Sequence, residues 1–176
     1  MDIMTIVFDL LKIIIPALIV FLTSFFILKS YLESEYKKKL LDVHMGAQNT
    51  ILPLRLQAYE RLTLFIERIS PNNIIMRVHQ TGMSARELQA VLLSDIRAEF
   101  EHNLSQQLYV SEHAWNVVRS VKEETFTLIN NAVAGLPAQA SGLDLSKVII
   151  EHLMKQEKNP YQLALSILKN EVQKLF

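Results

Sequence analysis

The chain has 176 residues, with 18 basic and 18 acidic side chains, no cysteine, and 50% hydrophobic residues. Its length allows one ordinary domain with an appendage. The zero net charge gives no general attraction to nucleic acid or to anionic membranes. Without cysteine, a disulfide framework, a thiolate metal site and a cysteine nucleophile are all excluded.

The first predicted element is an N-terminal membrane anchor. An uncharged run, IIIPALIVFLTSFFIL, extends from Ile13 to Leu28 and would span about 24 Å as a helix, against about 30 Å for a hydrocarbon core. Extension back to Leu10 includes Lys12, whose side chain can reach the membrane surface, so residues 10–28 are expected to contact lipid. A buried core helix is disfavoured because no polar stripe interrupts the run, and a cleaved signal peptide because the preceding residues are acidic.

The basic residues around this run predict its orientation. Four lysines follow it closely, at positions 29, 37, 38 and 39, whereas the tail before it has only Lys12. Because lysine and arginine accumulate on the cytoplasmic side of a membrane segment, the body of the protein is expected in the cytoplasm.

A juxtamembrane amphipathic helix is predicted for residues 29–46. One apolar row continues out of the anchor at steps of three and four residues, through Phe25, Leu28, Leu32, Tyr36, Leu40 and Val43. Such a row lies on one helical face, where it can pair with a second copy as a short coiled coil or dock on the protein's own body. Homodimerisation is therefore one hypothesis. The neighbouring lysines are balanced by acidic residues and are expected to face water.

Residues 47–176 are predicted to form a compact bundle of about five helices, which makes the chain all-α. Ala47 to Pro53 is expected to break the helix, with Pro53 in the first turn of the next one. The helix that starts near Pro53 is expected to end at Ile69, and a short apolar helix is expected from Ile74 to Val78. The next helix starts at Ser84 and carries an apolar row from Leu88 to Leu108, and another runs from Ser111 to Gly135. The last two run from Leu145, capped by Asp144, to about Gln156, and from Asn159 onward. No segment alternates with the period of a strand.

One motif could carry chemistry. Glu99 and His102 are three residues apart on a predicted helix, as are the metal ligands of carboxylate-bridged di-iron bundles. Such sites need a second Glu-x-x-His motif, which this chain lacks, so the surface interpretation is favoured for both residues. No catalytic residue, cofactor-binding residue or cofactor is predicted. His152 is a candidate core residue, and Trp115 is assigned to the core in preference to a partner surface.

Nucleic acid is not an expected partner. Five of the basic and five of the acidic residues precede Gly46, so the rest of the chain is also neutral. Direct binding would need a clustered basic surface.

The amino-acid sequences of two segments resemble those of a known protein family. Residues 51–78 (ILPLRLQAYERLTLFIERISPNNIIMRV) and 80–110 (QTGMSARELQAVLLSDIRAEFEHNLSQQLYV) resemble a family of small bacterial proteins of unknown function. The resemblance covers nearly the whole chain and implies a single-span protein of the bacterial inner membrane with a helical cytoplasmic body. It implies no activity and no site residues.

The function expected from these observations is that of a non-catalytic, membrane-anchored interaction protein: a scaffold, accessory subunit or assembly factor of an inner-membrane complex with unidentified protein partners. Two alternatives remain. One is a carboxylate/histidine metal-binding helical-bundle enzyme. The other is a stator-like stalk subunit, which is disfavoured because prolines and Gly82 are expected to interrupt the long helix that a stalk needs.

Overall fold

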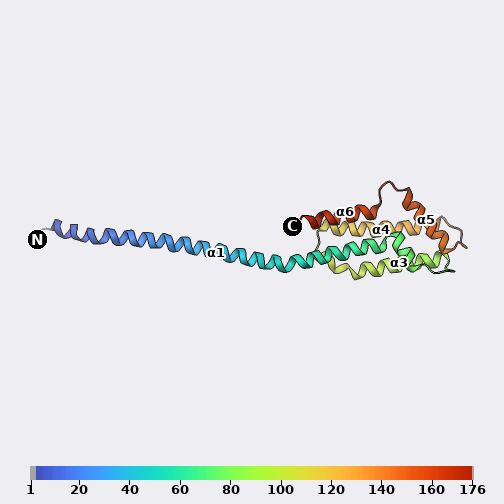
Figure 1. Cartoon of the computed structure of the whole chain (residues 1–176), viewed down its shortest axis with the longest axis horizontal. Helices are drawn as coiled ribbons and strands as arrows, with labels where there is room; N and C mark the ends of the chain where they lie inside the picture. The colour runs from blue at the N-terminus through green and yellow to red at the C-terminus, as the bar shows by residue number, and fades with distance from the viewer. Residues whose placement is uncertain (1–2, 176) are drawn as a thin grey trace. The chain divides into compact units, whose positions relative to one another are not determined.

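The computed structural model describes the backbone of residues 3–175 and the side chains of residues 12–40 and 50–175. The all-α prediction is confirmed, because the described residues contain no β-strand, only an isolated antiparallel bridge between Ser84 and Ser141. The helices in chain order are α1 (Ile3–Ile69), α2 (Pro71–Val78), α3 (Ala85–His102), the 3₁₀ helix η1 (Leu104–Leu108), α4 (Glu112–Ala134), α5 (Gly142–Lys155) and α6 (Pro160–Gln173) (Figure 1).

The predicted helix break at Ala47–Pro53 is wrong. Helix α1 continues without interruption from Ile3 to Ile69. A proline inside a helix removes one backbone donor and costs about 3 kcal/mol. Ending one helix and starting another would instead leave up to four carbonyl and four amide groups without helical partners. The packing of the chain still divides it into two compact units, residues 1–50 and 51–176.

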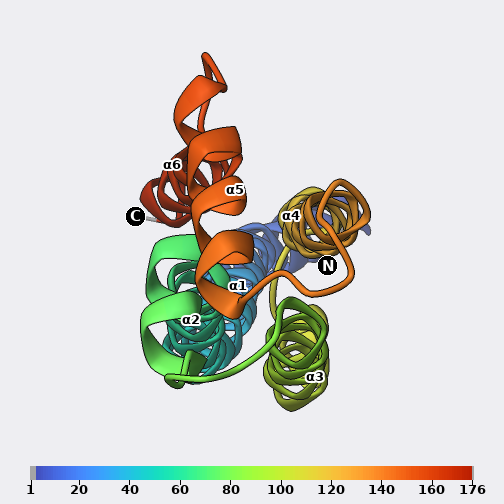
Figure 2. The same ribbon diagram turned by 90° about the vertical axis from the view of Figure 1, so that its right-hand side faces the viewer.

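The second unit is a bundle built around one apolar core. Helix α4 contacts both α3 and α6, and α5 contacts both α3 and α4 (Figure 2). The apolar rows predicted from sequence supply the core, whose largest fully buried side chains are Leu62, Phe65, Ile66, Ile69, Ile74, Leu88, Leu92, Ile96, Ile129, Leu145, Ile149 and Leu168.

An aromatic stack connects α1, α3 and α4 within this core. The Phe100 ring lies 5.8 Å from that of Phe65 and 5.4 Å from that of Trp115, measured between centroids. The Lys122 ammonium lies 4.3 Å from the Phe100 centroid and 2.8 Å from the Glu123 carboxylate. Cation–π attraction compensates part of the lost hydration of this mostly buried lysine. Trp115 is buried, as predicted.

The helix starts follow the predicted capping residues with one exception. Ser84 and Glu87 form a capping box at α3, Ser111 caps α4, and Asn159 caps α6. The assignment of Asp144 as a cap is wrong: Ser141 caps α5, and Asp144 occupies the third helical position of a second capping box. The serine hydroxyl accepts from the Asp144 amide at 3.2 Å while the carboxylate accepts from the Ser141 amide at 3.0 Å, which satisfies two backbone donors at once.

The helix predicted to carry the apolar row as far as Leu108 is shorter than expected. Helix α3 ends at His102, and the buried Asn103 side chain donates a 2.8 Å hydrogen bond to the Glu99 carbonyl. Asparagine competes in this way for backbone groups that would otherwise continue the helix. The chain then turns into η1, which leaves Leu108 78% exposed.

Two neighbouring leucines on α1 test the position of the core. Leu62 is fully buried, whereas Leu64 is 53% exposed. We expect Leu62→Ala to lower the free energy of unfolding by about 2–5 kcal/mol because it leaves a cavity. Leu64→Ala should change that free energy by less than about 0.5 kcal/mol. Chemical denaturation in detergent, followed by the fluorescence of Trp115, measures both; similar losses for the two variants would contradict the packing.

A buried hydroxyl pair joins α4 to α6. The Thr125 hydroxyl donates to the Val121 carbonyl at 2.7 Å, so the Tyr161 hydroxyl, 2.8 Å away, must donate to Thr125. Burial is the main cause that raises the pKa of Tyr161 from 10.0 to about 12, and the Glu124 charge adds to it; Thr125 opposes the rise because its hydroxyl can turn and donate to the ionised tyrosine.

This pKa predicts a loss of stability in alkali. Tyr161 is ionised above about pH 10 in the unfolded chain but stays protonated in the folded one up to about pH 12. Its stabilising contribution is complete below pH 10 and is lost as the pH rises to 12, by about 3 kcal/mol. Unfolding curves from pH 9 to 12 should show this fall, and Tyr161→Phe should remove that part of it. An equal alkaline loss in Tyr161→Phe would contradict the assignment.

Candidate functional site

The two candidate metal ligands, Glu99 and His102, lie in different surroundings. Glu99 of α3 forms an ion pair with Arg68 of α1, with 2.5 Å between the arginine Nη2 and the glutamate Oε1. His102 is exposed in the last turn of α3. In the part of the chain whose side chains are described, no three histidine, aspartate or glutamate residues are grouped closely enough to hold a metal ion. The ion pair gives Glu99 a structural role, and the metal interpretation stays an untested prediction.

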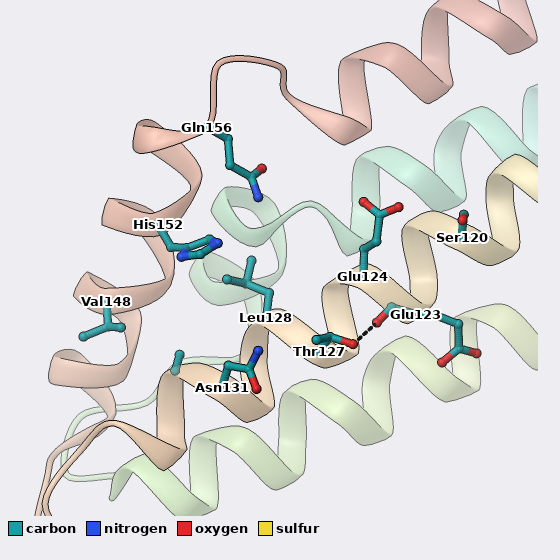
Figure 3. A pocket seen from close by; sticks show the side chains of 10 residues that line it. Ser120, Glu123, Glu124, Thr127, Leu128, Asn131, Val148, His152 and Gln156 are labelled. Atoms are coloured by element: carbon teal, nitrogen blue, oxygen red, sulfur yellow. Dashed lines mark hydrogen bonds between the residues drawn. The ribbon is translucent and has the colours of Figure 1, made fainter.

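The other histidines are scattered over the bundle. His113 is exposed and His79 is half-buried, and His44 lies outside the described side chains. The proposal of a core position for His152 is wrong, because this residue is exposed. It lies on the same face of α5 as Leu145 and Ile149, nearer the end of the helix, where it points into an open cleft (Figure 3).

This cleft, of about 470 Å³, separates α4 from α5. His152 and Gln156 reach into it from α5, and Glu124 and Leu128 face it from α4 (Figure 3). Thr127 donates a 2.9 Å hydrogen bond to the Glu123 carbonyl, within its own helix. The complete lining is Ser120, Glu123, Glu124, Thr127, Leu128, Asn131, Ala132, Val148, His152 and Gln156. Chemically, the cleft offers hydrogen-bond donors and acceptors to a small polar molecule.

A second depression is more apolar and lies between α1 and α6. It has a volume of about 560 Å³, an apolar floor and charged edges. Its lining is Leu56, Tyr59, Glu60, Thr63, Glu67, Leu165, Leu168, Lys169, Val172 and Gln173. Grooves of this kind accept the apolar face of an amphipathic helix.

Glu171 is the centre of a polar network that connects three helices. The Tyr59 hydroxyl of α1 donates to Glu171 at 2.7 Å. The Ser111 hydroxyl at the start of α4 donates to the same carboxylate at 2.5 and 2.7 Å. Ser111 also accepts from the Ala114 amide at 3.0 Å, so one hydroxyl both caps α4 and attaches it to α6. Nearby, the Arg55 Nε donates to the Tyr109 carbonyl at 3.2 Å.

The network shifts the ionisation of both of its acidic members. Burial raises the pKa of Glu171, but the hydrogen bonds from Ser111 and Tyr59, with the charges of His113 and Lys174, outweigh burial and leave that pKa below its ordinary value. The Tyr59 pKa is raised by burial and by its bond to Glu171. At neutral pH the arrangement is therefore a carboxylate that accepts from neutral hydroxyl donors. These hydrogen bonds join α1, α4 and α6.

Sequence reasoning missed the cleft, the groove and this network for one reason. Each is made by residues from different helices, and the periodicity of one helix does not reveal which neighbour it faces. The only signal was the assignment of Ser111 as a cap, which identified one member of the network but not its second role.

The first unit contains a helical stretch long and apolar enough to cross a membrane. It covers Lys12–Leu40, 29 residues whose most apolar window has a mean hydropathy of 2.2 and is not buried in the structure. The one threonine inside the uncharged run, Thr23, donates to the Ile19 and Val20 carbonyls at 2.9 Å. A hydroxyl paired within its own helix needs no partner from the surroundings, which suits an apolar environment.

Comparison with known proteins gives one match. The model of a family described as a family of unknown function (DUF7935) matches residues 5–175. The chain belongs to this family. No curated protein and no solved structure is significantly similar to it.

The DUF7935 match includes both units of the chain. It begins in the first turn of α1 and ends at Leu175, so it covers the apolar stretch Lys12–Leu40 together with the whole bundle. The DUF7935 family therefore includes both the exposed apolar helix and the packed body that follows it.

The lowered pKa of Glu171 predicts an acid-sensitive bundle. Because the folded pKa lies below the ordinary value of 4.5, the charged carboxylate stabilises the fold above about pH 4.5, and this contribution is lost as the pH falls through the folded pKa. Glu171→Gln should therefore show a smaller decrease in Tm between pH 5 and pH 3 than the natural chain does. The control Glu157→Gln, an exposed position outside the network, should keep the full decrease. Identical pH profiles for Glu171→Gln and the natural chain would contradict the role of the carboxylate.

Proposed function

We propose that this protein is a single-pass protein of the bacterial inner membrane with its helical body in the cytoplasm. In this proposal it acts without catalysis, as a scaffold, accessory subunit or assembly factor for a membrane complex. Lipid contacts residues 10–28, and the bundle contacts protein partners. Nucleic acid has no part in it.

The observation that carries the proposal is the apolar part of α1. Its large side chains are exposed along the helix, including Phe21 at 67%, Ile27 at 71% and Phe26 at 63%. Side chains of this size gain roughly 1.5–3 kcal/mol each on leaving water. A run of them in one helix therefore favours a lipid environment by far more than the cost of placing Lys12 near the membrane surface.

The orientation rests on the lysines after the run. Lys29 follows Leu28 directly, and Lys37, Lys38 and Lys39 come two to three turns later in the same helix. Lysines within 15–20 residues of a membrane segment favour the cytoplasmic side. This distribution supports a cytoplasmic bundle.

The interaction role is supported by the surface of the bundle. Met76 is 85% exposed, Met154 is 81% exposed, and Leu108 is 78% exposed. Methionine and leucine at such exposure can pack on a partner, and flexible methionine side chains adapt to different surfaces. The apolar groove between α1 and α6 adds a concave site for a helix.

A second candidate, the stator-like stalk, gains one observation. The stalk was disfavoured because prolines and Gly82 were expected to interrupt the long helix; α1 runs through one of them, Pro53, without a break, although it ends before Pro71. The part from Lys29 to Thr50 alone amounts to about 33 Å of helix. A stalk would bind partner subunits along that helix, whereas a scaffold would bind them mainly through the bundle.

Membrane extraction tests the anchor. The natural protein should remain in the pellet after membranes are washed with alkaline carbonate and urea. Each arginine placed at the middle of a spanning helix costs about 2.5–3.5 kcal/mol on insertion. The double variant Ile19→Arg, Leu22→Arg should therefore appear mostly in the supernatant. The control Ser30→Arg, Ser34→Arg carries the same added charge outside the proposed lipid segment and should stay in the pellet.

Protease protection and crosslinking complete the test. Protease added to intact spheroplasts should leave the bundle uncut, and protease added to inside-out vesicles should digest it. Crosslinking followed by gentle extraction and mass spectrometry should recover partner proteins, attached to the bundle for a scaffold and to residues 29–50 for a stalk. Release by carbonate, cleavage in spheroplasts, or a protein recovered alone as a monomer would each contradict the corresponding part of the proposal.

A further inference from the structure

Helix α1 carries an apolar ridge that lipid cannot cover completely. Leu28, Leu32, Tyr36 and Leu40 are four residues apart, and each is at least half exposed, from 50% at Leu40 to 69% at Tyr36. At 1.5 Å per residue, the last three lie about 6, 12 and 18 Å beyond the end of the proposed lipid segment at Leu28. The headgroup region on one side of a bilayer is about 5–8 Å thick. Tyr36 and Leu40 would therefore be in water unless another surface covers them.

We propose that a second copy of this chain covers the ridge, so that the protein is a parallel homodimer joined just outside the membrane. This inference rests on the proposed membrane anchor, and it names one binding partner of the protein. Two copies inserted in the same orientation present Leu32 and Tyr36 at the same height above the bilayer. Any other partner would need a matching apolar ridge at that height, whereas a second copy has one by construction.

The charges beside the ridge are compatible with self-association. The four ionisable residues that flank it most closely on a helical wheel are Lys29, Glu33, Glu35 and Lys39, two of each sign. Lys38 lies on the opposite face together with Ser34. The ridge of each copy therefore meets a surface whose flanking charges sum to zero, and the two remaining lysines, Lys37 and Lys38, lie away from the ridge.

The spacing of the ridge also predicts how the two helices cross. Ridges of residues four apart pack into one another at an interaxial angle of about −50°. Two helices that are each tilted by about 20–25° from the membrane normal, which is the usual range, produce such an angle. The contact is centred on Leu32 and Tyr36 and extends over only about three turns. A contact this short is weak on its own, so the dimer depends on confinement of both copies to one membrane, which raises their effective concentration.

Single cysteines provide the test, because the natural chain has none. Leu32→Cys, Tyr36→Cys, Ser34→Cys and Lys38→Cys are each produced at low abundance and oxidised in native membranes, and the disulfide dimer is quantified on a non-reducing gel. A disulfide needs the two Cβ atoms about 3.5–4.5 Å apart. Positions 32 and 36 should therefore yield at least about fivefold more dimer than positions 34 and 38. Co-expression with two tags shows that the product contains two copies of this chain.

A second measurement avoids placing cysteine at positions 32 and 36, the centre of the ridge. With Leu28→Cys as the reporter, Leu32→Glu should abolish the crosslink because two buried carboxylates would face each other, and Ser34→Glu should leave it unchanged. Equal crosslinking at all four positions would indicate random collision and overturn the proposal. So would the absence of dimer at 32 and 36, with or without a crosslink to a different protein. Carbonate washing of the same samples separates the two hypotheses, because a protein that stays in the pellet without forming the dimer refutes only the dimer.

Discussion

Backbone hydrogen bonding along α1 is the constraint on which the rest of the structure depends. In hydrocarbon every amide and carbonyl must find its partner inside the same segment, and a helix does this without outside help. In the bundle the same helix provides one wall of the core. A break between the apolar stretch and the bundle would leave up to four carbonyls and four amides without helical partners, whereas the continuous helix lacks only the one donor that Pro53 removes. Along this one helix the described side chains change from exposed apolar residues, as far as Leu54, to a buried face that begins at Ala58.

The bundle is closed at one place by polar bonds, in addition to its apolar core. Glu171 accepts from Tyr59 of α1 and from Ser111 at the start of α4. A charge-assisted bond to a carboxylate is shorter and stronger than a neutral one, and a partly buried carboxylate with two donors avoids the penalty of an unpaired charge. The network therefore fixes how three helices of different origin in the sequence align, which apolar packing alone specifies less sharply because leucine and isoleucine faces tolerate small shifts.

The elements that the sequence could predict are those decided by local physics. The serine and asparagine caps, the core rows of α3 and α4, and the burial of Trp115 all follow from patterns within one helix. The errors came where two local solutions compete. Asp144 and Ser141 both have side chains that cap helices, and their reciprocal bonds became visible only with the backbone in place. Asn103 could continue α3 or end it, and its buried bond to the Glu99 carbonyl ends it.

The candidate sites could be predicted far less well, because they depend on which helices face each other. The spacing of Glu99 and His102 would let both bind one metal ion, although the surface interpretation was favoured, and in the structure Arg68 of α1 pairs with Glu99. The cleft beside His152 likewise needs α4 and α5 to diverge, which neither helix specifies alone. The ridge from Leu28 to Leu40 is the exception, since all its members belong to one helix and their shared face follows from their spacing. That difference explains why the strongest functional inference for this chain concerns α1, where a linear pattern and its surroundings can be related directly, and not the pockets of the bundle.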